Sequence, residues 1–185
     1  MVEFLRSLTK FSLAFILLLF LGACSGVVAG GFNSFQSPDG RYGFLYPTGW
    51  TRISVSGGPQ VVFHDLINSD ETLSLVVSDV ANDIDLQELG SPEAVGERLI
   101  NEVIAPEGAG RTVELVEATQ RESSEHIFYD LEYKVHFENR DRHELSTVVI
   151  DRGSLYTLAT STNEIRWNKV EKIFRNVISS FTFLV

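Results

Sequence analysis

The stretch that decides the fold is Ile127-Phe-Tyr-Asp-Leu-Glu-Tyr-Lys-Val-His-Phe137. Its odd-numbered positions are all aliphatic or aromatic, whereas its even-numbered positions are polar apart from Phe128. This period of two predicts a long β-strand, because successive side chains point to opposite faces of a strand. One apolar and one polar face are typical of an antiparallel sheet with one buried face and one wetter face.

The neighbouring segments continue this pattern. Asn139-Arg-Asp-Arg142 is expected to turn the strand into a second one over residues 144–150. Asp151-Arg-Gly153 is expected to turn that strand into a third over residues 155–160. Runs rich in β-branched and aromatic residues predict further strands upstream. These runs cover residues 42–46, 51–55, 60–64, 72–78 and 112–118.

Two segments have helical spacing instead. Ser91-Pro92-Glu93 is a helix-start signal, since serine caps a helix and proline suits its first position. Asn163 is expected to cap a closing helix, with Glu164 near its positive end. Strands between two helices predict an α+β domain with a mainly antiparallel sheet. The apolar positions are Val95, Leu99, Ile100 and Val103 in the first helix, and Ile165, Val170, Ile173, Phe174, Val177 and Ile178 in the second.

The first residues have the pattern of a targeting segment. Arg6 and Lys10 precede an apolar run over residues 11–21, which is too short for a comfortable membrane-spanning helix. Leu21-Gly-Ala-Cys24 then has the form of a bacterial lipobox, and Cys24 is the one cysteine of the chain. We therefore expect a lipoprotein signal peptide over 1–23 and lipidation of Cys24. The alternative is an ordinary signal peptide that is cut near Ala29.

The predicted signal peptide sets the remaining organisation. Residues 24–34 are expected to form the lipidated N-terminus and a Gly-rich tether, and residues 35–185 the folded domain. The 185 residues carry 15 basic and 25 acidic side chains. Such an acidic surface repels phosphate backbones and anionic lipid headgroups, so nucleic-acid binding is not expected and membrane contact must come from the lipid.

A search for chemical motifs points to one candidate site. His136 and Glu138 lie two positions apart and share a strand face. If Arg140-Asp141 is a two-residue hairpin turn, His143 lies opposite Glu138 on that face. Two imidazoles and a carboxylate could bind zinc, or another divalent ion such as calcium, at the surface. The alternative is that these are solvated side chains, and no cofactor is required for the fold.

Motifs of catalysis are absent from the sequence. It contains no Gly-x-Ser-x-Gly elbow, no phosphate-binding Gly-rich loop and no His-Glu-x-x-His. A cysteine nucleophile is excluded if Cys24 is lipidated. The sequence therefore predicts that the protein is not an enzyme.

Two stretches resemble the PsbP family, the extrinsic subunits of the photosystem II oxygen-evolving complex. The first is Phe35-Gln-Ser-Pro-Asp-Gly-Arg-Tyr-Gly-Phe-Leu-Tyr-Pro-Thr-Gly-Trp50. The second is Leu155-Tyr-Thr-Leu-Ala-Thr-Ser-Thr-Asn-Glu-Ile-Arg-Trp167, followed by Phe174 and Ser180-Phe-Thr-Phe183. The resemblance runs over about residues 35–185. It implies an α/β/α sandwich around an antiparallel sheet, no enzymatic activity and a place on the lumenal face of the thylakoid membrane.

With the lipobox, the chain is similar to the cyanobacterial form of this family. The resemblance then implies a lipid-anchored monomer that binds the photosystem II core or an assembly intermediate. Plant members carry a longer N-terminal extension, whereas residues 24–34 are short, which favours an accessory or assembly role over plant-like retention of calcium and chloride. The alternative is a periplasmic lipoprotein that binds a small ligand or a divalent metal.

Overall fold

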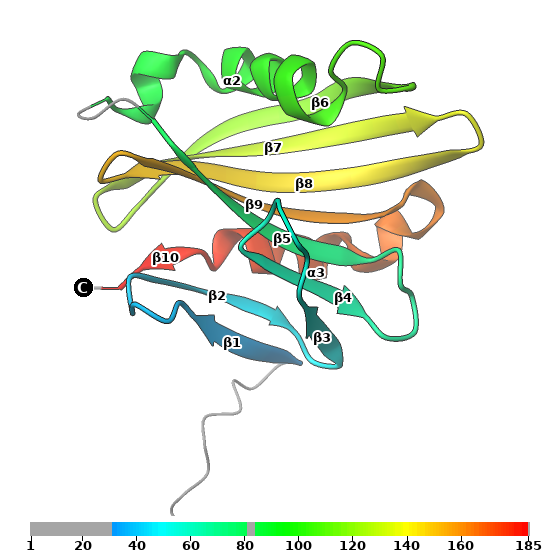
Figure 1. Ribbon diagram of the computed structural model, residues 1–185, viewed down its shortest axis with the longest axis horizontal. Helices are drawn as coiled ribbons and strands as arrows, with labels where there is room; N and C mark the ends of the chain where they lie inside the picture. The colour runs from blue at the N-terminus through cyan, green and yellow to red at the C-terminus, as the bar shows by residue number, and fades with distance from the viewer. Residues whose placement is uncertain (1–30, 81–83, 185) are drawn as a thin grey trace, which may run out of the picture. The chain divides into compact units, whose positions relative to one another are not determined.

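A seven-stranded antiparallel sheet underlies the fold in the computed structural model, which describes residues 31–80 and 84–184 (Figure 1). Its strand order is β3-β4-β5-β9-β8-β7-β6, and every neighbouring pair is antiparallel. The mainly antiparallel sheet predicted from the sequence is therefore confirmed. The strands are β3 (Trp50–Ile53), β4 (Val61–Asp65), β5 (Thr72–Asp79), β6 (Arg111–Ser123), β7 (His126–Phe137), β8 (Arg140–Asp151) and β9 (Ser154–Asn163).

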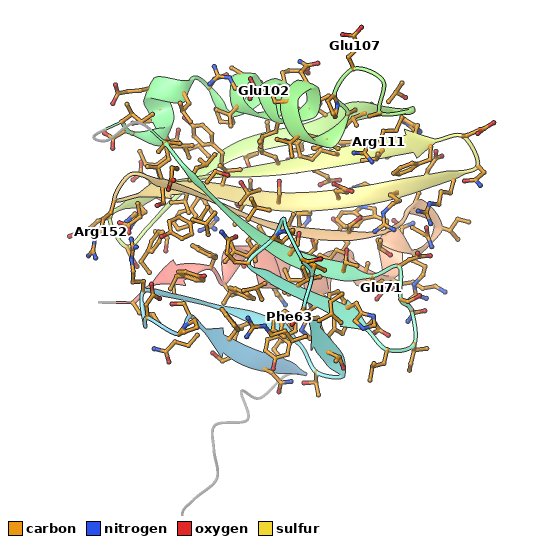
Figure 2. All side chains as sticks on the ribbon, viewed as in Figure 1. Phe63, Glu71, Glu102, Glu107, Arg111 and Arg152 are labelled. Carbon is orange, nitrogen blue, oxygen red and sulfur yellow. The ribbon has the colours of Figure 1, made fainter. Side chains whose placement is uncertain are left out.

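The two ends of this sheet carry different loops. The β4–β5 loop, the β7–β8 turn and the link from β9 to the last helix lie at one end, which we call the Glu71 end. The β6–β7 and β8–β9 turns lie at the other, the Arg152 end. Figure 2 shows Glu71 and Arg152 on opposite sides of the domain.

A second, three-stranded sheet has the order β1-β2-β10. It packs on the large sheet through aromatic rings, and Phe181 lies 5.8 Å from Tyr42 and 6.3 Å from Phe128 between ring centroids. The predicted tether is shortened by this sheet, because β1 already begins at Phe32. The strands are β1 (Phe32–Gln36), β2 (Tyr42–Pro47) and β10 (Thr182–Phe183).

The helices cover both faces of the large sheet (Figure 1). Helix α2 contacts β6 and β7, whereas α3 contacts β8 and β9 and also β2. This arrangement is the expected α/β/α sandwich. The prediction of a wetter sheet face is wrong, since α3 and the small sheet cover that face. The helical segments are η2 (Leu86–Leu89), α2 (Pro92–Leu99), the π-helical turn η3 (Ile100–Ile104), η4 (Glu164–Arg166) and α3 (Trp167–Ser179).

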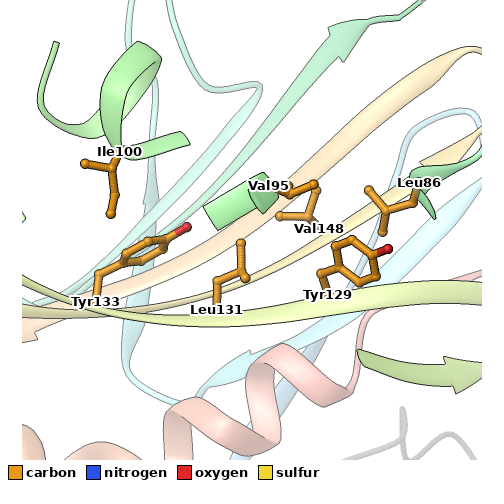
Figure 3. Close-up of a cluster of buried hydrophobic side chains, with 7 residues drawn as sticks. All are labelled: Leu86, Val95, Ile100, Tyr129, Leu131, Tyr133 and Val148. Atoms are coloured by element: carbon orange, nitrogen blue, oxygen red, sulfur yellow. The ribbon is translucent and has the colours of Figure 1, made fainter. Parts of the chain in front are cut away.

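Helix α2 begins where the sequence predicts. The Ser91 hydroxyl accepts a hydrogen bond from the Ala94 backbone N–H at 3.3 Å, so the predicted cap is confirmed. Its buried face packs on the odd-numbered side chains of β7 (Figure 3). Val103 does not join this stripe, because the chain changes from α to π geometry after Leu99 and leaves Val103 exposed. The buried cluster is Leu86, Val95, Ile100, Tyr129, Leu131, Tyr133 and Val148.

The opposite layer is held by α3. Phe174 and Val177 are completely buried against the large sheet, as the predicted stripe requires. All buried hydrophobic side chains among the described residues lie between Phe35 and Phe181. The compact unit Asn33–Val185 therefore contains its own core, and we expect it to fold without the preceding residues.

Candidate functional site

The predicted metal ligands lie on the β7–β8 hairpin but do not converge. The strands pair His136 with Asp141, so the two-residue turn is Glu138-Asn139 and not Arg140-Asp141. Glu138 is exposed in this turn, and His136 Nδ1 lies 3.0 Å from Asp141 Oδ1. His143, in contrast, is buried. The hairpin register on which the zinc site was predicted is wrong.

His143 has both ring nitrogens occupied. Nε2 lies 2.8 Å from Glu132 Oε1, and Nδ1 lies 2.7 Å from Glu164 Oε2. Each ring nitrogen therefore lies within hydrogen-bond distance of a carboxylate oxygen. No nitrogen is left for a metal. Across residues 31–80 and 84–184, no group of three or more His, Cys, Asp and Glu side chains could hold a metal ion.

The imidazole is also packed from above. The indole of Trp167, the first residue of α3, stacks on His143 at 3.7 Å between centroids and 9° between planes. Both stacked side chains are buried. The stack therefore links the start of α3 to the middle of the sheet.

Two further charges, Lys134 and Arg175, join these residues. We call Glu132, Lys134, His143, Glu164 and Arg175 the buried charge cluster, after its two buried members Glu132 and His143. Arg175 Nη2 donates to Glu132 Oε2 at 2.6 Å, and Lys134 Nζ lies 3.4 Å from Glu164 Oε1. Burial alone would lower the pKa of Arg175, but its hydrogen bonds to Glu171 and Glu132 outweigh burial and raise that pKa.

The positions of these side chains follow from strand register. Glu132 and Lys134 are two apart on β7 and share a face, and His143 is the direct partner of Lys134 on β8. Glu164 follows β9, and Arg175 reaches down from α3. The cluster thus connects the sheet to the last helix, and the pairing of its two buried members is suited to fixing an arrangement of elements.

A second polar group lies at the Glu71 end. The Arg142 guanidinium donates to Ser161 Oγ at 2.9 Å and to the Asp70 carbonyl at 2.8 Å. Ser161 Oγ in turn donates to Glu144 Oε1 at 3.2 Å. Burial lowers the pKa of Arg142, and burial raises the pKa of Glu144 against the opposing effect of the nearby Arg142 charge.

Neither polar group has the geometry of a catalytic site. Both ring nitrogens of His143 face carboxylates, so this imidazole is not placed to activate a hydroxyl or thiol nucleophile. His136 and Glu138 border a solvent-open hollow of about 600 Å³, whose other wall is the segment 105–112. Arg111 in this segment packs on β7, because its guanidinium lies 5.6 Å from the centre of the Phe137 ring.

Sequence reasoning missed most of the buried charge cluster. It placed Glu132 and Lys134 on a solvated face and gave Glu164 only a helix-dipole role. The available signal was Phe128 on the same face, together with an amphipathic closing helix that needed an apolar surface to cover. Cys24, the predicted lipidation site, lies outside the described residues.

The fold and the site define a small α+β domain with an antiparallel sheet covered on both faces and a charged cluster that joins its layers. The family model described as PsbP matches residues 30–183, and the chain belongs to the PsbP family. Among the described residues, no helix is long and apolar enough to cross a membrane.

Curated relatives agree over nearly the whole chain. CyanoP of Thermosynechococcus vestitus is 41% identical over 172 residues, which cover 90% of this chain and 93% of the relative. CyanoP of Synechocystis sp. is 39% identical, with 87% of this chain and 88% of the relative covered. PsbP-like protein 1 from Arabidopsis thaliana chloroplasts is 32% identical, with 84% and 66% covered.

Solved structures show the same fold. The solution structure of CyanoP from Synechocystis sp. superposes with a TM-score of 0.73 at 38% identity, covering 88% of this chain and 98% of that one. The crystal structure of LpqN from Mycobacterium tuberculosis superposes with a TM-score of 0.58 at 13% identity, covering 83% and 91%. The second likeness concerns the fold alone.

Proposed function

We propose that this chain is a non-enzymatic accessory protein of photosystem II, anchored by lipid at Cys24 on the lumenal side of the thylakoid membrane. It acts as a monomer in the assembly or stabilisation of the oxygen-evolving complex, by binding the photosystem II core or an assembly intermediate. The main support for this proposal is the 41% identity to CyanoP over 90% of the chain, because the similarity then extends over almost every helix and strand.

The lipid anchor is supported by the leader sequence. Leu21-Gly-Ala-Cys24 follows a charged segment and a short apolar run, and the chain has no other cysteine that could be acylated. More than one acyl chain on Cys24 would give stable membrane binding, because each buried CH₂ contributes about 0.8 kcal/mol.

The non-enzymatic role is supported by the way the polar groups are used. The buried charges of the described residues pair with one another, and His143 is enclosed between two carboxylates and Trp167. We also propose that the domain needs no cofactor. Calorimetric titration of the domain with zinc and with calcium is the measurement, and tight binding that stabilises the fold would contradict this part.

The decisive experiment is co-purification. A tagged chain is recovered from detergent-solubilised thylakoids, and we expect photosystem II core subunits to accompany it. The untagged strain provides the background. Recovery with cell-envelope fractions alone, without these subunits, would contradict the proposal and favour a periplasmic lipoprotein that binds a small ligand or metal.

The anchor is tested separately with Cys24→Ser. This residue lies outside the folded unit Asn33–Val185, so the variant should keep its fold. We expect it to be released from membranes by washing, while the parent chain stays bound. A variant that remains fully membrane-bound after its leader has been cleaved would show that acylation of Cys24 is not what holds the domain there.

A further inference from the structure

Three aliphatic side chains at the Glu71 end of the large sheet protrude from the domain. Leu66 is 66% exposed, Ile67 is 91% exposed and Ile165 is 93% exposed. The helical spacing predicted Ile165 to lie in the core, but the chain forms η4 at this point and turns the side chain outward. We call these three side chains the aliphatic tips. A contiguous exposed apolar patch is typical of a contact with a protein or a membrane, whereas single exposed apolar side chains are ordinary.

The loop that carries two of the tips is held in place by its own backbone. The Asp65 carboxylate accepts hydrogen bonds from the backbone N–H groups of Ile67 and Asn68 at 2.6 and 2.8 Å. The loop is closed by a bond from the Asp65 N–H to the Glu71 carbonyl at 3.1 Å. Ile67 is therefore presented by a defined turn.

The third tip belongs to the same surface. The Asn163 side chain donates to Asp70 Oδ2 at 2.8 Å, and Arg166 is paired with Glu71. These contacts join the turn that contains Ile165 to the β4–β5 loop. In Figure 1 both segments lie at the same end of the large sheet.

The charges around the tips are balanced, although the chain as a whole carries a net charge of −10. The two segments that carry the tips contain four carboxylates. Four cations lie on these segments or form ion pairs with them. A rim without net charge gives the tips no electrostatic preference for a charged surface over an uncharged one. The rim consists of Asp65, Asp70, Glu71 and Glu164 with Lys134, Arg140, Arg142 and Arg166.

The chain also enters the domain at this end. Strands β1 and β2 follow one another in the chain and are neighbours in the small sheet. The first residue of β1, Phe32, therefore lies near the last residue of β2, Pro47. Two residues later Trp50 pairs with Asp65, directly before Leu66. From Cys24 to Phe32 the chain can span at most about 28 Å, even fully extended.

We propose that the aliphatic tips insert into the surface of a bilayer made of uncharged lipids and set the orientation of the domain on it. Ile67 and Ile165 are almost fully exposed, so an occupant that covers them must surround each side chain, and a bilayer does so without a matching hole for each one. Three isolated side chains also provide much less than the roughly 800 Å² per partner of a stable protein interface. In the cell, this insertion rests on the proposed anchor at Cys24, which would hold the Glu71 end of the domain close to the membrane.

The test measures depth in a system that does not need acylation. Residues 31–185 contain no cysteine and hold the complete core, so they can carry a histidine tag at the N-terminus and one introduced thiol. Fluorophores are placed at Ile67→Cys, Ile165→Cys and, as a matched control, Val55→Cys. Val55 is 43% exposed in the loop after β3, which leads away from the Glu71 end. The tagged domains are bound to phosphatidylcholine vesicles that contain nickel-chelating lipid and brominated lipid.

We expect bromine to quench the labels at positions 67 and 165 but not the label at 55. Equal quenching at all three positions, or none at 67 and 165, would overturn the proposal. A response of the tip labels to photosystem II core complexes in detergent, without one to vesicles, would assign the tips to a protein partner and also overturn it. The tag replaces the acyl chains, so neither result depends on whether Cys24 is lipidated.

A second measurement uses the untagged domain. Flotation with phosphatidylcholine vesicles gives a partition coefficient, and the double variant Ile67→Asp/Ile165→Asp should lower it about tenfold or more, since full burial of even one such side chain corresponds to that factor. Val55→Asp should leave it unchanged. These positions are outside the core, so the variants should fold normally. An unchanged partition coefficient in the double variant would contradict insertion of the tips.

Discussion

His143 shares its ring nitrogens between two carboxylates, and through them it connects three parts of the fold. Glu132 belongs to β7, Glu164 follows β9, and the ring itself projects from β8 under Trp167. Removing one member of a buried charge pair leaves its partner without compensation, which costs more than the pair itself contributes. The residue is therefore central to the attachment of α3.

His143→Phe tests this role. Phenylalanine keeps a flat ring under Trp167, but it leaves the buried Glu132 with Arg175 as its remaining partner. We expect the free energy of unfolding to fall by about 2–4 kcal/mol. Urea denaturation of the domain is the measurement. The control is His136→Ala, whose exposed pair with Asp141 should contribute less than about 1 kcal/mol. Equal losses in the two variants would show that the buried charge cluster contributes no more to the free energy of unfolding than an exposed ion pair.

Glu144 provides a prediction about pH. Burial raises its pKa in the folded state above the ordinary value of 4.5, with the Arg142 charge opposing the shift. The folded state therefore binds the proton more tightly than the unfolded chain. This contribution to stability is complete below the unfolded pKa and is lost as the pH rises through the folded pKa.

Glu144→Gln cannot ionise and should not show that loss. We expect the stability of the variant relative to the parent to increase as the pH rises above the ordinary glutamate pKa of 4.5. Urea denaturation at a series of pH values gives this difference directly. If the stability difference between variant and parent stays constant with pH, or decreases, the Glu144 carboxylate is at least as well stabilised in the fold as in water.

Among the elements, α3 connects the most distant parts of the domain. It contacts β8 and β9 of the large sheet and β2 of the small one. Phe174→Ala removes a completely buried ring that meets Trp50 and Trp167 edge-on, and should lower the free energy of unfolding by about 3–5 kcal/mol. Ile173→Ala, at a 39% exposed position of the same helix, should cost less than about 1 kcal/mol. Thermal denaturation separates the two, and similar losses would contradict this packing.

Elements were predictable from the sequence where a periodic pattern and a turn signal coincide. The β8–β9 hairpin satisfies this condition, and so does α2 with its Ser91 cap, whereas the β7–β8 turn lies two residues before its predicted position. The start of α3 was not predictable, because the Asn163 side chain bonds Asp70 on a distant loop and does not cap the helix. A partner 93 positions away overrode the local signal.

The candidate site was less predictable than the fold. The alternation of β7 correctly separates its two faces, but it does not say what covers the polar face. Whether His143 is a surface ligand or a buried pair depends on the hairpin turn, and a change in that turn shifts every cross-strand partner. What covers the polar face of β7 depends on how α3 packs on the sheet, and the local sequence of β7 does not contain that information.

For the whole molecule, charge is the property that acts over distance. The part of the chain after residue 23 carries 13 basic and 24 acidic side chains, so it has a strongly negative field. A field of this kind speeds association with a positively charged surface and slows association with a negative one. The proposed partner should therefore present basic segments to the domain.

This gives a prediction about salt. If basic segments of the photosystem II core attract the acidic domain, added salt should slow association by about tenfold between about 0.05 M and 0.5 M, because it screens charges beyond a few ångströms. The dissociation rate should change much less, since it reports contacts already made. Surface plasmon resonance with immobilised core complexes measures both rates. An association rate that does not depend on salt would show that the net charge serves solubility and has no part in partner choice.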